Sequence, residues 1–152
     1  MSLYPEVSSS FDCADAAELV LYDNCPVLGM IDIFTANVAS VQSGVILVNV
    51  GALRHIQELH ATQIQCSTLS EIADFVFTVV SEYEQIYEGT DGSILLAKDI
   101  DKHNAVVAAG YIENGIYRIK TAGVRRKRSF RNKKLLFSKS RREPSCNRLC
   151  YD

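Results

Sequence analysis

The sequence predicts an α+β domain, a mostly antiparallel sheet with amphipathic helices packed on it, plus a basic C-terminal tail. A capping box followed by apolar residues at helical spacing predicts a long helix over 68–88. Asn114-Gly115 between two apolar runs predicts a β-hairpin. Most of the basic residues follow residue 123. With 47% hydrophobic residues in 152, the chain can build the core of one domain.

The N-terminal part of the chain is predicted to begin as a loose arm and to continue into a helix. Residues 1–11 form the arm, because Pro5 and a serine run leave little to bury. Residues 12–22 fit either a short helix or a short strand. Turn residues at 23–26 indicate a break. Apolar residues then recur every three or four positions, which predicts a helix over 27–41.

The middle of the chain alternates between strand and helix patterns. A β-branched run predicts a buried strand over 45–50, and helix-forming residues predict a short helix over 52–60. Thr68 and Glu71 form the capping box that begins the helix over 68–88. The sequence therefore predicts two helices after the first central strand.

Three further strands are predicted after the long helix. Residues 93–97 form the first, and residues 105–112 and 116–122 form the hairpin around Asn114-Gly115. Because neighbouring strands joined by short turns pair antiparallel, these elements predict the sheet onto which the helices pack.

The charge divides the chain into two parts. Residues 12–123 are predicted to be one acidic α+β domain, and residues 124–152 a basic C-terminal segment. Residues 1–123 carry five basic residues and sixteen carboxylates, a net charge of −11, whereas 124–152 carry eleven basic residues and two carboxylates, a net charge of +9. Such a segment favours a polyanionic partner.

Catalytic and cofactor motifs are missing from the sequence. The glycines do not follow GxGxxG or GxxxxGK[ST] spacing, and there is no GxSxG elbow. We therefore expect no cofactor, no metal site and no catalytic residue, and an enzyme is the third class of function considered. Asp99, Asp101 and His103 alternate, so an extended segment would project them to one side as potential ligands, although they also suit a polar connection between strands.

The basic segment is the candidate functional site. Its cations attract phosphates, and the rings of Phe130 and Phe137 are candidates for stacking on unpaired bases. RNA or another single-stranded nucleic acid is the expected partner. Ser129 follows Arg-Arg-Lys-Arg, a context that basophilic kinases prefer, so we expect phosphorylation there to weaken binding. The expected nucleic-acid-binding residues are Arg125, Arg126, Lys127, Arg128, Phe130, Arg131, Lys133 and Lys134.

Other interpretations of the basic segment stay open. It resembles a nuclear-localisation signal, residues 135–137 among cations suit an anionic membrane surface, and an acidic protein or the acidic domain itself could neutralise it. The rival function is a protein-interaction or scaffold module, a helix-on-sheet dimer whose basic tail is a targeting signal.

The location expected from the sequence is intracellular, in the cytoplasm, the nucleus or both. The five cysteines are odd in number and widely spread, which favours a reducing compartment. The first residues lack a basic signal region, and no apolar run reaches the roughly 18 residues of a transmembrane helix.

Overall fold

The computed structural model describes residues 21–22 and 25–139. The predicted arm over 1–11, most of the segment over 12–22 and the end of the tail over 140–152 lie outside the described residues. The described elements in chain order are β1 (Leu21–Tyr22), β2 (Cys25–Ile31), α2 (Ile33–Ala39), β3 (Gly44–Leu47), α3 (Val50–Ile64), α4 (Leu69–Glu82), β4 (Gln85–Glu88), η2 (Thr90–Gly92), β5 (Ile94–Ile100), β6 (His103–Glu113), β7 (Ile116–Arg126), η3 (Lys127–Phe130) and β8 (Leu135–Ser138).

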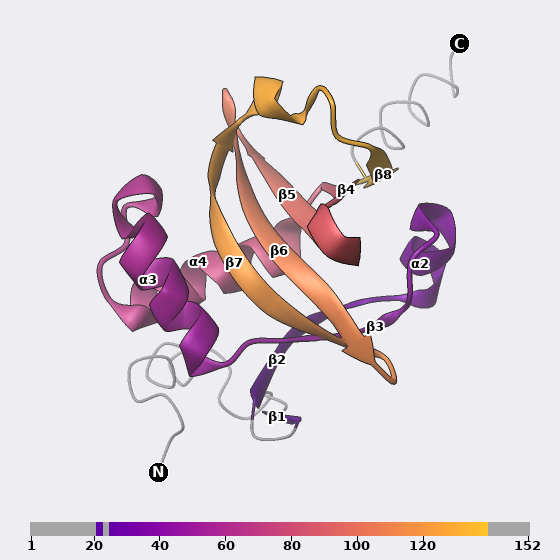
Figure 1. The fold of residues 1–152 in the computed structure, drawn as a ribbon, viewed down its shortest axis with the longest axis horizontal. Helices are drawn as coiled ribbons and strands as arrows, with labels where there is room; N and C mark the ends of the chain where they lie inside the picture. The colour runs from indigo at the N-terminus through magenta and orange to yellow at the C-terminus, as the bar shows by residue number, and fades with distance from the viewer. Residues whose placement is uncertain (1–20, 23–24, 140–152) are drawn as a thin grey trace, which may run out of the picture.

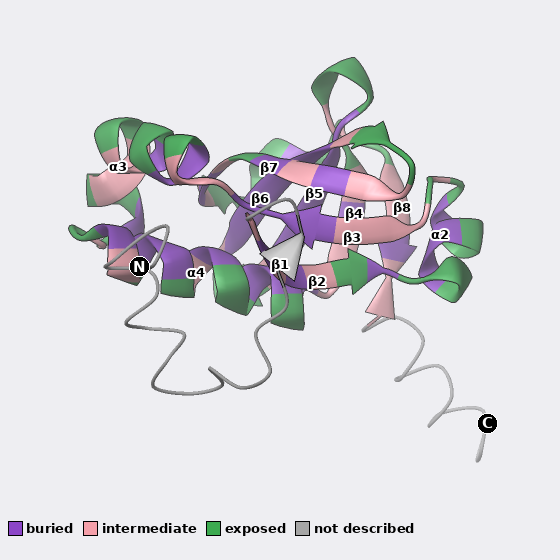
Figure 2. Ribbon diagram, turned by 90° about the horizontal axis from the view of Figure 1, so that it is seen from below, coloured by how far each residue is buried: buried purple, intermediate pink, exposed green. Residues whose placement is uncertain are grey.

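The strands form one sheet in the order β1-β2-β3-β7-β6-β5-β4-β8 (Figure 1). Every neighbouring pair of these strands is antiparallel except β3 and β7, which are parallel. The helices α3 and α4 pack on this sheet, and Figure 2 shows exposed residues on their outer faces. The predicted α+β class with a mostly antiparallel sheet is confirmed.

The predicted helix over 27–41 is wrong, because strand β2 and the short helix α2 occupy those residues. A β-bulge between Val27 and Gly29 interrupts the alternation of β2, and Leu28 and Ile31, three residues apart, both reach the core. That spacing imitates a helix. The real helix begins after Asp32, whose carboxylate accepts a hydrogen bond of 2.7 Å from the backbone N–H of Thr35.

Of the two longer helices, α4 begins at the predicted capping box, but the bounds of both differ from those predicted. Thr68 and Glu71 make the predicted capping box at the start of α4. This helix ends at Glu82 rather than at residue 88, because Tyr83 adopts an extended conformation and the following residues form β4. Ile86 fits the apolar pattern and is fully buried, but it faces the core from a strand. Periodicity alone did not reveal this change.

The predicted hairpin is confirmed as β6 and β7. Asn114 and Gly115 both have positive φ angles, 51° and 78°, as a type I′ turn requires. The predicted strand over 93–97 corresponds to β5, which pairs with β6 along its whole length. These three strands form the centre of the sheet.

Apolar residues cover both faces of the sheet, but unequally. The main core lies under the helices and contains Leu96 and Val107. Their neighbours Leu95 and Val106 point to the opposite face, since successive side chains in a strand alternate. There they form a small second cluster with Ala97, Ala108 and Phe130. The second face is the one over which the basic segment runs.

Candidate nucleic-acid interface

The described part of the basic segment is built into the sheet. Residues 124–126 complete β7, residues 127–130 form η3, and residues 135–138 form β8. Strand β8 pairs with β4, with Phe137 opposite Ile86, so the segment passes from β7 to the far edge of the sheet. Figure 1 shows this path from the end of β7 to β8. The stretch of chain that carries the cations between β7 and β8 is therefore held by the sheet at both of its ends.

The start of β6 brings further basic residues to the same place. Antiparallel pairing sets His103 opposite Arg126 and Asn104 opposite Arg125. The backbone N–H of Lys127 donates a hydrogen bond of 3.1 Å to the carbonyl of Lys102. Lys102 and His103 therefore adjoin the predicted site, although the sequence places them in the acidic part of the chain. The sequence could have indicated them, because counting residue pairs from the predicted Asn114-Gly115 turn along both strands brings His103 close to Arg126.

Phe130 anchors η3 and does not display its ring to solvent. Only 5% of Phe130 is exposed, and its ring lies against Tyr87 with centroids 4.8 Å apart. Phe137 is also buried, in the main core. The expectation that these rings stack on bases is corrected, because the apolar surface of the sheet already covers them. The segment over 135–137 likewise lies in β8, paired with β4, rather than free to rest on a membrane.

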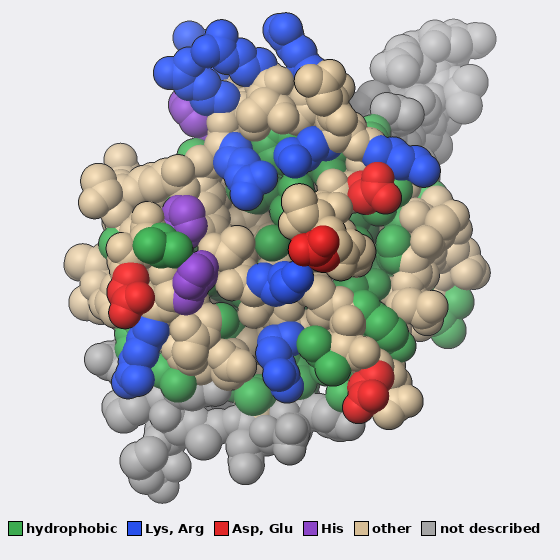
Figure 3. Space-filling view, in the orientation of Figure 1, with side chains coloured by type: hydrophobic (Ala, Val, Ile, Leu, Met, Phe, Trp, Pro, Cys, Tyr) green, Lys and Arg blue, Asp and Glu red, His purple; other side chains and the backbone are tan. Residues whose placement is uncertain are grey.

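Most described cations of this segment are exposed and have no carboxylate partner among the described residues. Lys127 forms an ion pair with Asp99. Lys139 lies over the ring of Tyr83, 3.9 Å from its centroid. Figure 3 shows Lys and Arg side chains gathered at the upper end of the molecule and continuing over the viewed face. The side chains that are exposed and free of carboxylate ion pairs within the described part are Arg125, Arg126, Arg128, Arg131 and Lys134, with Lys133 half-buried.

Four of the basic side chains line a single depression, which we call the basic hollow. It is formed by Lys102, His103, Arg126 and Arg128 and has a volume of about 400 Å³. Two of the four come from the turn before β6 and the start of that strand, and two come from the end of β7 and from η3. Among the described residues, no carboxylate lines the hollow, so it favours anions.

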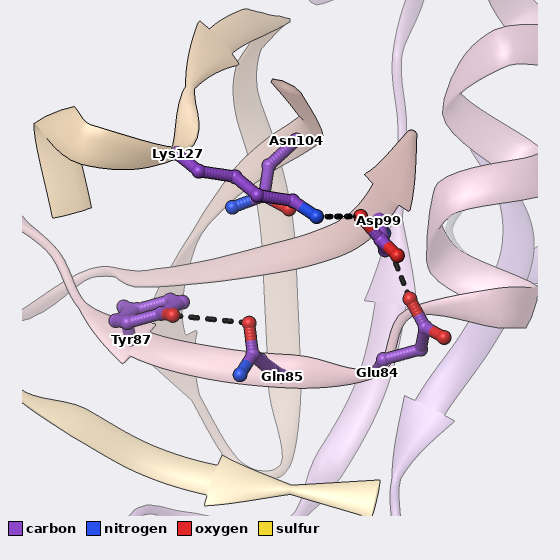
Figure 4. Close-up of a pocket in the computed structure, with 6 residues that line it drawn as sticks. All are labelled: Glu84, Gln85, Tyr87, Asp99, Asn104 and Lys127. Atoms are coloured by element: carbon purple, nitrogen blue, oxygen red, sulfur yellow. Dashed lines mark hydrogen bonds and ion pairs between the residues drawn. The ribbon is translucent and has the colours of Figure 1, made fainter. Parts of the chain in front are cut away.

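A polar pocket of about 330 Å³ lies beside this region (Figure 4). Asp99 and Lys127 form their ion pair in this pocket, and the backbone N–H of Asp99 donates a hydrogen bond of 2.8 Å to Glu84 Oε1. The hydroxyl of Tyr87 donates a hydrogen bond of 3.0 Å to Gln85 Oε1. Through Asp99, these contacts join β5 to η3 and to Glu84 directly before β4, so the carboxylates of the pocket stabilise the fold next to the basic segment.

The structure separates the three residues that alternate at 99–103. Ile100 ends β5, Asp101 lies in a tight turn with φ of 66°, and His103 begins β6. The segment is therefore a reverse turn and not the extended stretch that would project all three to one side. Asp99 pairs with Lys127, whereas His103 lines the basic hollow. In the described part of the chain, no three His, Cys, Asp or Glu residues are grouped to hold a metal ion.

Helix α3 packs along β7 and reaches the start of the basic segment. Gln63 accepts a hydrogen bond of 2.8 Å from the backbone N–H of Val124. Burial lowers the pKa of His60, and the neighbouring His55 and Arg125 lower this pKa further. The positive charge of Arg125 thus acts on a residue of α3. The pKa of His60 should therefore change when the charge at the basic segment changes.

Comparison with known proteins gave no assignment. Scans against models of protein families, against curated proteins and against solved structures each found no match. No helix in the described ranges is both long and apolar enough to cross a membrane.

Proposed function

We propose that this protein binds nucleic acid, and RNA in particular, through contacts to phosphates rather than by catalysing a reaction. The proposal is supported by exposed cations held in place by β7, η3 and β8, most of them without a carboxylate partner among the described residues. A flexible basic tail loses conformational entropy on binding, whereas cations anchored by β7 and β8 are already ordered. The arrangement thus favours binding.

The expected mode of binding is dominated by the backbone of the nucleic acid. Lys and Arg side chains that neutralise phosphates release condensed counterions, which makes affinity depend on salt. Because Phe130 and Phe137 are buried, stacking on bases contributes little, and we expect only weak preference among base sequences. The 2′-hydroxyl is the group through which RNA would be preferred to DNA.

The decisive experiment compares two variants of the full chain with equal net charge. Arg125→Gln/Arg131→Gln removes two exposed cations of the basic segment, and Arg54→Gln/Lys98→Gln removes two cations from α3 and β5. Deleting residues 124–152 is unsuitable, because it also removes the end of β7 and all of β8. Affinity for RNA and DNA oligonucleotides is measured by fluorescence anisotropy over a range of salt concentrations.

The first variant is expected to bind roughly tenfold more weakly, with a salt slope smaller by about 1.4 for two lost contacts to a single strand. The second variant is expected to bind as the parent does. Equal losses in both variants would show that only net charge matters. A salt-independent affinity would contradict binding through phosphates.

A protein-interaction function is the second candidate, and exposed apolar residues on β2 and α2 favour it. Met30, Ile33 and Val38 on β2 and α2 are 56%, 70% and 53% exposed. Large apolar side chains exposed on neighbouring elements occur at protein interfaces. Sedimentation of the parent and of Ile33→Ser at several concentrations tests self-association. A parent protein that stays monomeric at all concentrations would contradict the expected homodimer. Nuclear import through the basic segment stays a separate prediction.

A further inference from the structure

The basic hollow has the composition of a seat for one phosphate group. Arg126 and Arg128 present forked guanidinium donors, Lys102 adds a compact charge, and His103 adds a ring nitrogen donor. We propose that the basic hollow binds a single phosphate group, either within a nucleic-acid strand or at its end. This inference rests on the proposed function and assigns one phosphate of the ligand to a particular set of four side chains.

The charges around the hollow favour an anion. None of its four lining residues forms an ion pair with a carboxylate among the described residues. The acidic residues that precede Lys102 in the sequence are Asp99, which forms an ion pair with Lys127, and Asp101 in the adjacent turn. Neither of these carboxylates lines the hollow. A phosphate there meets three permanent positive charges, and guanidinium groups can bind phosphate oxygens in pairs.

The backbone beneath the hollow is fixed before any ligand binds. The pairing of His103 with Arg126 sets two of its walls, and the hydrogen bond from Lys127 to Lys102 joins the turn to η3. The Ser129 hydroxyl donates a hydrogen bond of 2.7 Å to the carbonyl of Arg126. Preorganised donors lose less entropy on binding than mobile ones. This distinguishes the hollow from cations that are merely exposed.

The volume of the hollow suits a phosphate together with part of its sugar. A space of about 400 Å³ lies at the lower end of the range typical of small-ligand sites, roughly 300–1,000 Å³. Inorganic phosphate should therefore bind weakly and a 5′-phosphorylated oligonucleotide more tightly. A site for a terminal phosphate prefers that oligonucleotide to its 5′-hydroxyl form, whereas a site for an internal phosphate binds both equally.

The test uses the full chain and opposite changes of charge at neighbouring positions. Lys102→Gln removes a lining charge, and Asp101→Asn removes a nearby negative charge. Asn tolerates the left-handed backbone at position 101, so this variant should keep the turn. Inorganic phosphate and the two oligonucleotides are titrated while amide shifts are followed by NMR. Lys102→Arg keeps the charge at the same position and separates loss of charge from change of side chain, and Arg54→Gln on α3 is the control away from the hollow.

We expect phosphate to shift the amides of residues 102–103 and 126–128 first. Lys102→Gln should bind roughly fivefold more weakly and Asp101→Asn roughly twofold more tightly, since single exposed charges contribute up to about 1 kcal/mol. Lys102→Arg should bind phosphate more tightly than Lys102→Gln because it keeps the positive charge, and Arg54→Gln should bind as the parent does. Amide shifts elsewhere, or equal affinities of Lys102→Gln and Asp101→Asn, would overturn the assignment.

The two proposals fail in different ways. If Arg125→Gln/Arg131→Gln loses RNA affinity while Lys102→Gln does not, the protein binds nucleic acid and the hollow is not the phosphate site. If inorganic phosphate binds at the hollow but no oligonucleotide binds, the proposed function is wrong. The phosphate that the hollow binds would then not belong to a nucleic acid.

Discussion

The two faces of the sheet differ in what covers them and in what they can do. One face is covered by α3 and α4 and holds most of the buried aliphatic side chains. The other holds a small cluster of Leu95, Val106, two alanines and Phe130, beside which the exposed cations lie. The large core on the first face stabilises the fold. The small apolar cluster on the second face holds η3 and its charged residues in place. Substitutions on the two faces should therefore separate stability from binding.

The largest effect is expected from a cavity in the main core. Ile72 on α4 is fully buried, so Ile72→Ala should lower the free energy of unfolding by about 2–5 kcal/mol. Because Ile72 is buried in the main core and not among the exposed cations, RNA affinity below the unfolding transition should match that of the parent. Urea denaturation and anisotropy measure the two quantities. A fall in affinity of the folded variant would mean that the faces are coupled.

A conservative change on the second face should have the opposite pattern. Phe130→Leu keeps an apolar side chain under η3 and should cost about 1 kcal/mol of stability. The ring contact with Tyr87 is lost, so η3 and its cations should be less well fixed and RNA affinity should fall severalfold. An unchanged affinity would show that the anchor is unnecessary for binding.

Phosphorylation of Ser129 should affect binding with little effect on stability. Ser129 is exposed, and its hydroxyl donates to the carbonyl of Arg126. Ser129→Glu removes this hydrogen bond and sets a negative charge beside the guanidinium groups, which should weaken RNA binding roughly threefold. Ser129→Ala is the matched control, because it loses the hydrogen bond without adding charge. If the Glu and Ala variants bind equally, charge at this position does not regulate the site.

The smallest effect is expected at His60, whose pKa is influenced by Arg125 of the basic segment. Its pKa lies below the ordinary value of 6.5 because of burial, His55 and Arg125. The unfolded chain therefore takes up a proton first, and stability should fall as the pH drops below 6.5 through the folded-state pKa. Arg125→Gln should raise the pKa of His60, as should bound RNA. NMR titration of the imidazole measures both shifts, and a decrease in either case would contradict this electrostatic coupling.

The sequence predicts local features of this fold better than long-range ones. The capping box at Thr68 and the turn at Asn114-Gly115 are determined by neighbouring residues and were predicted correctly. The bulge in β2 was missed because it makes buried strand residues appear at helical spacing. The pairing of β8 with β4 joins residues about fifty positions apart, and nothing local in residues 135–138 indicates it.

The candidate site was located by charge but not fully defined by it. The high density of basic residues predicted a site at residues 125–134. Lys102 was not predicted, because its neighbours in the sequence are acidic, and only the pairing of β6 with β7 places it near Arg126 and Arg128. The burial of Phe130 also required knowledge of the opposite sheet face, since an aromatic residue among cations suits an anchor as well as a stacking surface.

The crossing from β7 to β8 has a consequence for how the protein can diversify. Both ends of this crossing are fastened by a phenylalanine, Phe130 on one face of the sheet and Phe137 on the other. The stretch between them at residues 131–134 contributes no strand to the sheet. Its length and composition can therefore vary by insertion while the scaffold persists, so the reach of the molecule toward a partner can change independently of its folding.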